Sequence, residues 1–425
     1  MKKTIALGIV FLFVVMSFTS IPGIQLNNQS IRNSGRGDIL YVGGNGTGNY
    51  TTIQSAIDDA SDGDTVFVYD DSSPYYESIT IENSINLIGE DKNTTIIEGF
   101  ENGRDGIGIY SDFVNVTGFT TRKFKWNIAS GVHIYRKNYC NIVDNIFNDN
   151  SYGVRICESN YNNISKNIIF SNYEGILLEN GCDYNNIVEN KIYKNSRVGI
   201  DLSGYLTNIS YNIIEDNGGM GIEVLGDDNI FYGNIIKNHT YEGLNFWDSN
   251  RNLISNNYLL NNDYGIYMWT TYGYDDYCVY CTIKENVISN CKYDGINIDG
   301  IGHRVFKNTI TDCNVGIFIS ALDSDFFWNN IIKNDKGILI SLISSDNNNI
   351  LHNNFINNKR DASSTLFPRG NIWDGNYWDK WIGIRIPIPI FQKLPKIIIG
   401  LGITFDWHPS KEPYNYTTTQ GCGIE

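Results

Sequence analysis

Basic residues are scarce in this sequence. Its 425 residues include 32 lysines and arginines against 47 aspartates and glutamates, which gives a formal net charge of −15. Nucleic acids and anionic membrane surfaces both favour a basic protein face. The charge therefore argues against these partners and is compatible with cations or neutral glycans.

Long uncharged apolar runs are also missing beyond the N-terminus. The apolar stretch 382–405 is interrupted by Arg385, Lys393 and several prolines. A membrane-spanning helix needs about 18 or more uncharged apolar residues. We therefore expect no transmembrane span after the N-terminal segment.

A 3.6-residue apolar stripe does not persist along the chain, while asparagine, glycine and β-branched residues, which disfavour helix interiors, are frequent. This excludes a helical repeat. What recurs is a glycine followed by an aliphatic residue, any residue and an apolar residue, at steps of 21 to 30 residues. Such a period predicts a solenoid. The phrase begins at Gly106, Gly131, Gly153, Gly175, Gly199, Gly221, Gly243, Gly265, Gly295, Gly316 and Gly337.

Each repeat has two readable parts. After the glycine, apolar residues alternate with variable ones, which predicts a strand with one face inward. The second part reads Asn-Ile-x-x-Asn, as in 141–145, 163–167, 186–190 and 208–212. We expect the trailing asparagines to adopt a left-handed backbone at a tight turn and to hydrogen-bond to one another along the axis. The predicted fold is all-β: a parallel β-helix with turns about 4.8 Å apart.

The ends of the chain differ from the repeats. Two lysines and a short apolar run predict a signal peptide over 1–23, cleaved or retained as an anchor, and a polar linker follows over 24–38. The β-helix domain is expected over 39–381. Within it, 53–60 forms a short capping helix and 371–381 opens an aromatic C-terminal cap, which continues as the tail 382–425. We expect a secreted, periplasmic or cell-surface protein.

Eight cysteines in an exported chain suggest disulfides. Cys291 and Cys313 are 22 residues apart, and Cys157 and Cys182 are 25 apart, so each pair is predicted to lie on adjacent turns and to bond. The single Cys-x-x-C motif, 278–281, lacks a second pair or nearby histidines. It favours a disulfide or free thiols over a metal site.

Three stretches carry a family resemblance. Residues 50–57 with 63–66 resemble an N-terminal capping segment, the repeats resemble sugar-hydrolase-type β-helix coils, and 376–378 resembles a common ending. Together they are similar to the right-handed parallel β-helix superfamily of pectin-lyase-like proteins, and within it to the NosD-type family of periplasmic copper-binding proteins. The resemblance implies a fold more than an activity, because this fold has many functions.

Copper is implied by the resemblance alone. The five histidines are scattered, without a ligand-spaced pair, and methionine is rare. Calcium is the other candidate metal, and Asp-rich loops such as 275–276 could bind it.

The outward face of the strand after each glycine is the predicted site. Carboxylates beside aromatic rings suit a sugar groove, although a solvated acidic surface would show the same residues. The candidate ligand-binding residues are Glu179, Asp201, Glu223, Asn245, Trp247, Tyr267, Trp269 and Asp299.

Catalysis is the alternative use of this face. Asp201 and Glu223 could act as a carboxylate pair, with Arg155 as the base of a lyase. The Asn-Thr-Asp and Gly-His-Gly signatures of β-helix polygalacturonases are missing, and 226–228 (Gly-Asp-Asp) is a fragment that arises easily by chance.

The sequence therefore favours a non-catalytic exported protein that binds a polysaccharide. A polysaccharide lyase or glycoside hydrolase, and a NosD-like accessory factor for copper-enzyme maturation, are the alternatives.

Overall fold

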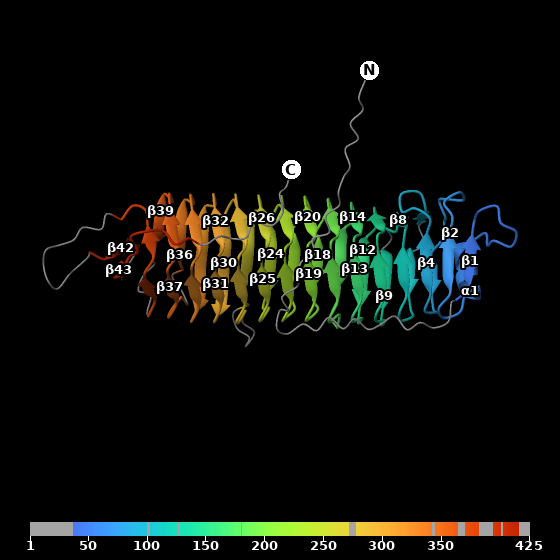
Figure 1. Ribbon diagram of the computed structural model, residues 1–425, viewed down its shortest axis with the longest axis horizontal. Helices are drawn as coiled ribbons and strands as arrows, with labels where there is room; N and C mark the ends of the chain where they lie inside the picture. Colours follow the sequence, from blue (N-terminus) through green and yellow to red (C-terminus); the bar gives the residue numbers. More distant parts are fainter. Residues whose placement is uncertain are drawn as a thin grey trace, which may run out of the picture. The chain divides into compact units, whose positions relative to one another are not determined.

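The computed structural model describes residues 37–99, 103–125, 128–179, 181–271, 278–341, 345–363, 370–381, 394–400 and 403–415. They form a coil of short strands wound into three sheets (Figure 1). Each full turn contributes one strand to each sheet, and in the repeats a strand pairs with the strand three places later in the chain. At the ends of sheet 1 the spacing differs, since β1 pairs with β2, β2 with β4, and β42 with β43. The predicted signal peptide, most of the linker, and 382–393 of the tail lie outside the described residues.

Sheet 1 has parallel pairing throughout, except for an antiparallel pair at its C-terminal end. Its strands are β1 (Ile39–Val42), β2 (Thr65–Val68), β4 (Asn86–Gly89), β7 (Asn115–Thr117), β10 (Asn141–Val143), β13 (Asn163–Ser165), β16 (Asn186–Val188), β19 (Asn208–Ser210), β22 (Ile230–Tyr232), β25 (Leu253–Ser255), β28 (Thr282–Lys284), β31 (Arg304–Phe306), β34 (Asp325–Phe327), β37 (Asn349–Leu351), β40 (Ile372–Asp374), β42 (Lys396–Ile399) and β43 (Ile403–Asp406).

Sheet 2 is formed entirely from three-residue strands, apart from its last. Its strands are β5 (Ile96–Glu98), β8 (Thr120–Arg122), β11 (Ile146–Asn148), β14 (Ile168–Phe170), β17 (Lys191–Tyr193), β20 (Ile213–Glu215), β23 (Ile235–Lys237), β26 (Tyr258–Leu260), β29 (Val287–Ser289), β32 (Thr309–Thr311), β35 (Asn330–Ile332), β38 (Asn354–Ile356) and β41 (Tyr377–Trp378).

Sheet 3 contains the strands that follow the repeated glycines. They are β3 (Ile79–Ile81), β6 (Ile107–Ile109), β9 (Ser130–Tyr135), β12 (Tyr152–Cys157), β15 (Glu174–Leu178), β18 (Ile200–Leu202), β21 (Ile222–Val224), β24 (Glu242–Trp247), β27 (Tyr264–Trp269), β30 (Asp294–Ile301), β33 (Val315–Leu322), β36 (Lys336–Ile340) and β39 (Arg360–Ser363).

The core is a set of columns of identical or similar apolar residues. The middle residue of each three-residue strand of sheet 1 points inward, so that Ile142, Ile164, Ile187 and Ile209 stack as register partners and are fully buried. Each such isoleucine contributes on the order of 1.5–3 kcal/mol through burial of its side chain. The all-β parallel β-helix predicted from the sequence is thus confirmed.

The repeated glycine marks a close approach between turns. A Cβ on Gly221 would lie 2.5 Å from the carbonyl oxygen of Gly243 and 2.7 Å from the Cγ2 of Ile236. The same contacts recur at neighbouring turns. Any side chain here would push adjacent turns apart, so the glycines are needed for space and not for a left-handed backbone.

The asparagine ladder predicted from the sequence is present. Asn145, Asn167 and Asn190 are register-aligned and buried, and the backbone N–H and side-chain amide of each donate to the Oδ1 of the next, at 2.9–3.3 Å. Parallel ladders run along the other two corners, through Asn172 and Asn195 and through Asn162 and Asn185. Buried amide groups are satisfied in this way at each turn.

One detail of the ladder prediction is wrong. The left-handed residue is the one before the asparagine: Asp144, Lys166 and Glu189 have φ of 58–59°. The bend at that residue turns the following asparagine inward, where its N–H and amide reach the next turn. Side chains of the bent residues point outward, so residues of many types occupy this position.

The two ends of the coil are closed differently. At the N-terminal end, α1 (Ile53–Asp59) places Ile53, Ala56 and Ile57 against the core, as predicted, and the Glu77 carboxylate accepts the N–H groups of Ile53 and Gln54. Carboxylates are favourable at this end of a helix.

At the C-terminal end, β42 and β43 extend sheet 1 as an antiparallel pair. The Asp406 carboxylate terminates the asparagine ladder. Its Oδ2 accepts the backbone N–H and side-chain amide of Asn376 and the indole N–H of Trp378, at 3.0–3.1 Å.

Neither predicted disulfide is formed in the structure. The cysteines of both pairs are free thiols and are buried. Cys313 donates to the carbonyl of Thr311 at 3.3 Å, and Cys182 donates to the carbonyl of Ile156 at 3.1 Å. Cys157 faces His133 instead, with its Sγ 3.3 Å from Nε2. The thiols therefore fill turn positions and find neighbouring polar partners.

Candidate functional site

The outward face of sheet 3 brings several predicted site residues together. Asp201, Glu223, Asn245 and Tyr267 are register partners on the successive strands β18, β21, β24 and β27. They form one row that crosses the strands, because the repeat places equivalent residues side by side.

Arg197 organises the acidic part of this row. Its guanidinium contacts the carboxylates of Glu174, Asp201 (3.0 Å) and Glu223 (2.7 Å). These three carboxylates are largely buried, whereas the arginine side chain is 40% exposed and covers them. Arg197 precedes β18 in the chain, and its side chain reaches carboxylates on three turns.

Burial governs the protonation of this cluster. It raises the pKa values of Glu174, Asp201 and Glu223, and the ion pairs with Arg197 oppose the rise in each case. Burial lowers the pKa of the Arg197 guanidinium, but its hydrogen bonds to Glu174 and Asp201 outweigh this and raise it overall. The carboxylates therefore take up protons more readily than exposed ones.

Further along, the face becomes aromatic. Trp247 and Trp269 are register partners with ring centroids 4.5 Å apart, and Trp269 is 40% exposed. Tyr267 packs edge-on against Tyr264, which stacks on Tyr293. This gives a half-exposed surface of rings directly after the carboxylates.

Three buried polar atoms beside these rings lack a hydrogen-bond partner among the described residues. They are Oε2 of Glu242, Oδ1 of Asn245 and the indole Nε1 of Trp247, all on β24. An unsatisfied buried polar atom costs about 1–3 kcal/mol. Burial also raises the pKa of Glu242. We call β24 with Trp269 and Tyr267 the aromatic strip.

The remaining predicted residues have other partners. Glu179 forms an ion pair with Arg155 at 2.6 Å, so the predicted lyase base is a paired guanidinium whose pKa lies above its usual value. A guanidinium does not lose its proton in a protein, which argues against that role. Asp299 accepts the N–H of Gly300 at 2.8 Å and lies at the far end of β30.

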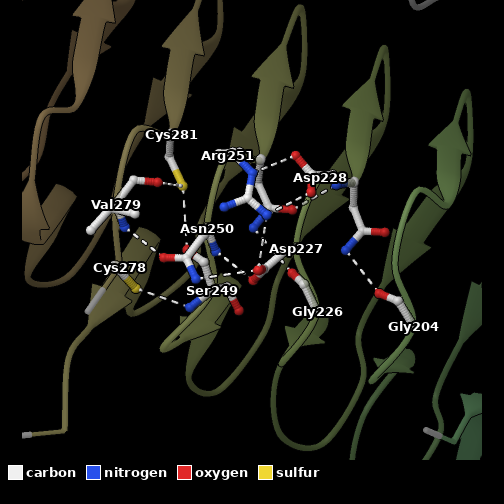
Figure 2. A network of polar contacts seen from close by, with 12 residues as sticks. Gly204, Gly226, Asp227, Asp228, Ser249, Asn250, Arg251, Cys278, Val279 and Cys281 are labelled. Atoms are coloured by element: carbon white, nitrogen blue, oxygen red, sulfur yellow. Dashed lines mark hydrogen bonds and ion pairs between the residues drawn. The ribbon is translucent and has the colours of Figure 1, made fainter. Parts of the chain in front are cut away.

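The Gly-Asp-Asp fragment has a structural role. Asp228 binds Arg251 through Nε (2.8 Å) and Nη2 (2.7 Å), while Asp227 accepts the backbone N–H of Asn250 at 2.8 Å (Figure 2). These contacts join neighbouring turns at one corner. They leave no reason to assign this fragment to catalysis.

The Cys-x-x-C motif lies beside the same corner (Figure 2). Cys278 and Cys281 are fully buried, and Cys281 donates to the carbonyl of Ser249 at 3.4 Å. Burial raises the pKa of Cys278 to about 12. Within the described residues, no group of three or more His, Cys, Asp or Glu side chains is placed to hold a metal ion. The Asp275–Asp276 calcium candidate lies outside the described residues.

Sequence reasoning missed Arg197, Glu174 and Glu242. The two glutamates immediately precede repeated glycines, at a position not read as outward-facing. Their recurrence just before Gly175 and Gly243 is the signal that could have found them. Arg197 lies outside any regular strand, so the period alone gives no indication of its contacts.

The comparisons agree with this architecture. Residues 57–242 match the family model described as periplasmic copper-binding protein (NosD), and residues 183–324 and 272–372 match the right handed beta helix region. The chain is therefore a parallel β-helix protein, and the resemblance to NosD-type and right-handed β-helix repeats that the sequence predicted is confirmed over these residues.

A curated relative is a cell surface glycoprotein of Methanothermus fervidus, 29% identical over an alignment of 377 residues that covers 83% of this chain. The chain spans 56% of that protein's length. Two solved structures, the A-modules of the mannuronan C-5 epimerases AlgE6 and AlgE4 of Azotobacter vinelandii, align with a TM-score of 0.50 over 75% of this chain and 94% of theirs. At 13% and 12% identity they support the fold alone. No helix among the described residues is long and apolar enough to cross a membrane.

Proposed function

We propose that this protein binds a polysaccharide non-catalytically along the outer face of sheet 3, with the aromatic strip as the central contact. One observation carries the proposal: three buried polar atoms of β24 lack partners among the described residues, and their residues are register partners of the aromatic residues Tyr264, Tyr267 and Trp269. Sugars offer an apolar ring face together with several hydroxyl groups, and binding sites for them combine apolar contact with a few placed polar groups.

The polar atoms define how a sugar would be oriented. Oε2 of Glu242 and Oδ1 of Asn245 would accept hydroxyl protons, and the indole N–H of Trp247 would donate to a sugar oxygen. Trp269 would pack against the ring. The neighbouring carboxylates around Arg197 disfavour a polyanion, so the expected ligand at the aromatic strip is a neutral glycan.

The proposed location is the cell surface or envelope. The relative from Methanothermus fervidus is a cell surface glycoprotein, and the matched NosD family is described as periplasmic. The signal peptide predicted at 1–23 agrees with export.

A glycan array followed by titration of the best neutral oligosaccharide tests the proposal. Trp269→Ala should weaken binding about tenfold or more, equivalent to about 1.4 kcal/mol. The matched control is Trp328→Ala, which removes a similarly exposed tryptophan outside sheet 3. Equal affinity for wild type and Trp269→Ala, or an equal loss in both variants, would contradict the proposal.

A second candidate function is glycan cleavage, favoured by the adjacent carboxylates with raised pKa values. Assays for reducing ends and for unsaturated products decide between the two. Cleavage that Glu223→Gln abolishes while glycan binding persists would favour the enzyme. Absence of product from every bound glycan would favour the binding protein.

A further inference from the structure

A cavity lies at the C-terminal end of sheet 3. It has a volume of about 750 Å3 and is bounded by β36, β39, β42 and the turn after β41. Ligand sites for small molecules have volumes of about 300–1,000 Å3. The cavity is therefore large enough for a small ligand, and its lining shares no residue with the aromatic strip.

Its charge is opposite to that of the whole chain. Five lining residues are cationic, and one, Asp361, is a carboxylate. The protein as a whole carries a net charge of −15. A local excess of positive charge on an acidic protein attracts anions to that place. The cations are Lys336, Lys359, Arg360, Lys380 and Lys396.

Two of these cations oppose each other directly. Lys336 on β36 and Arg360 on β39 are register partners on neighbouring strands. Like charges at such positions are destabilising. Neither side chain forms an ion pair with a described residue, whereas Lys359 is paired with Asp335 at 2.6 Å. An anion held between Lys336 and Arg360 would remove this repulsion.

One lining residue of the cavity, Asp361, offers a hydrogen-bond acceptor. Asp361 is 7% exposed, and its Oδ2 lies 3.2 Å from the ammonium group of Lys396. The other oxygen, Oδ1, is buried without a partner among the described residues. Lys396 in turn lies 5.1 Å over the ring of Trp378, which fixes its position. Oδ1 can therefore accept a ligand hydroxyl while the cations face an anionic group.

We propose that this cavity binds the anionic group of a small hydroxylated ligand, with Lys336 and Arg360 on the carboxylate, sulfate or phosphate and Asp361 on an adjacent hydroxyl. The anionic group can belong to an acidic sugar or to a free oxyanion. The proposal does not depend on glycan binding at the aromatic strip.

Calorimetric titration of the full chain with glucuronate, inorganic sulfate, inorganic phosphate and glucose tests the proposal. Glucuronate or an inorganic anion should bind, and glucose should bind at least about tenfold more weakly. Tighter binding of glucuronate identifies an acidic sugar as the source of the anion, and tighter binding of sulfate or phosphate identifies a free oxyanion. Binding should weaken strongly between about 0.01 M and about 1 M ionic strength.

The double variant Lys336→Gln, Arg360→Gln should lose about tenfold or more in anion affinity. Its control, Lys284→Gln, Arg304→Gln, removes two charges from sheet 1 and should bind as wild type does. Circular dichroism verifies that both variants fold. Anion affinity that is insensitive to the first pair, or wild-type binding unaffected by salt or equal for glucose, would overturn the proposal. Neutral glycan binding that persists in the first variant separates the two sites.

Discussion

At the scale of single residues, Arg197 is the side chain on which the acidic cluster depends. Arg197→Gln leaves Glu174, Asp201 and Glu223 close together without their shared cation. Breaking a buried ion pair costs about 3–5 kcal/mol. Because Arg197 is 40% exposed, solvent screening reduces the expected loss of unfolding free energy to about 1–2 kcal/mol at neutral pH.

Urea denaturation measures this loss. Arg136→Gln, which removes a solvent-exposed arginine paired with Glu158, is the control and should leave the midpoint nearly unchanged. The destabilisation of Arg197→Gln should shrink as the pH is lowered, because the raised pKa values let the carboxylates become neutral early. A loss that does not vary with pH would contradict this electrostatic account.

A second residue-scale prediction concerns the repeated glycine. Gly221→Ala brings a Cβ within 2.5 Å of a backbone carbonyl, and we expect a loss of about 1–3 kcal/mol from overpacking. Gly108→Ala is the control. Its added Cβ would lie 2.9 Å from the ring of Tyr110, and this exposed side chain can move away. Thermal unfolding of both variants compares them, and equal midpoints would contradict the close-approach explanation.

At the scale of single residues, the repeat period predicts some contacts and not others. The period predicts which Cα atoms are neighbours, so the adjacency of Asp201 and Glu223 followed from counting. It does not predict where a long side chain lies, and so the contacts of Arg197 were missed. The prediction placed the left-handed residue of each turn one position too late. Asparagine often adopts the left-handed backbone, but in this fold it is needed for the ladder, and the residue before it makes the bend.

At the scale of ladders and strands, two histidines replace asparagine. His239 accepts from the amide of Asn217 at Nε2 and donates to Oδ1 of Asn262 through Nδ1, at 3.2 and 3.0 Å. His303 accepts the N–H of Cys281 at Nδ1 (3.2 Å) and donates to the carbonyl of Asp299. Each ring therefore fits its ladder only in the neutral form.

Acid should destabilise the fold through these two histidines. Burial lowers the pKa of each to about 4, from 6.5. As the pH falls from about 6.5 to about 4, the unfolded chain binds protons that the folded chain does not. Stability is therefore full above pH 6.5 and decreases below it, by up to about 3 kcal/mol for each histidine.

The variant His239→Asn, His303→Asn should lose this part of the acid sensitivity. Chemical denaturation of variant and wild type between about pH 7 and pH 4 gives the difference directly, which cancels the contribution of the carboxylates. Parallel pH profiles for the two proteins would show that these histidines titrate normally.

At the scale of the described coil, the N-terminal closure protects both the core and an open sheet edge. β1 is the edge strand of sheet 1, and α1 packs against β1, β2 and β3. An uncovered edge is a template for pairing with other chains. Ile53→Asp should displace α1 and produce concentration-dependent association, measured by light scattering.

Asp58→Asn is the control for this prediction, because Asp58 is an exposed residue of the same helix. It should leave the protein in the same state of association as wild type. Equal scattering from all three proteins across the concentration range would show that α1 does not guard the edge.

The C-terminal cavity shows the limit of repeat-based prediction at this scale. Lys336 and Arg360 belong to the repeats, and their adjacency follows the period. Lys396 belongs to β42, outside the repeats, and its contact with Asp361 spans 35 positions of the chain. Only the folded arrangement of the non-repeating segment brings the cavity together.

The Asp406 carboxylate determines where the asparagine ladder ends. An amide receives hydrogen bonds on one side and gives them on the other, so a row of amides has a direction and could in principle continue without limit. Asp406 has a side chain that only receives them, and the row stops there. Adding or deleting whole repeats upstream leaves this stop chemically unchanged. The length of the coil can thus change by one turn at a time.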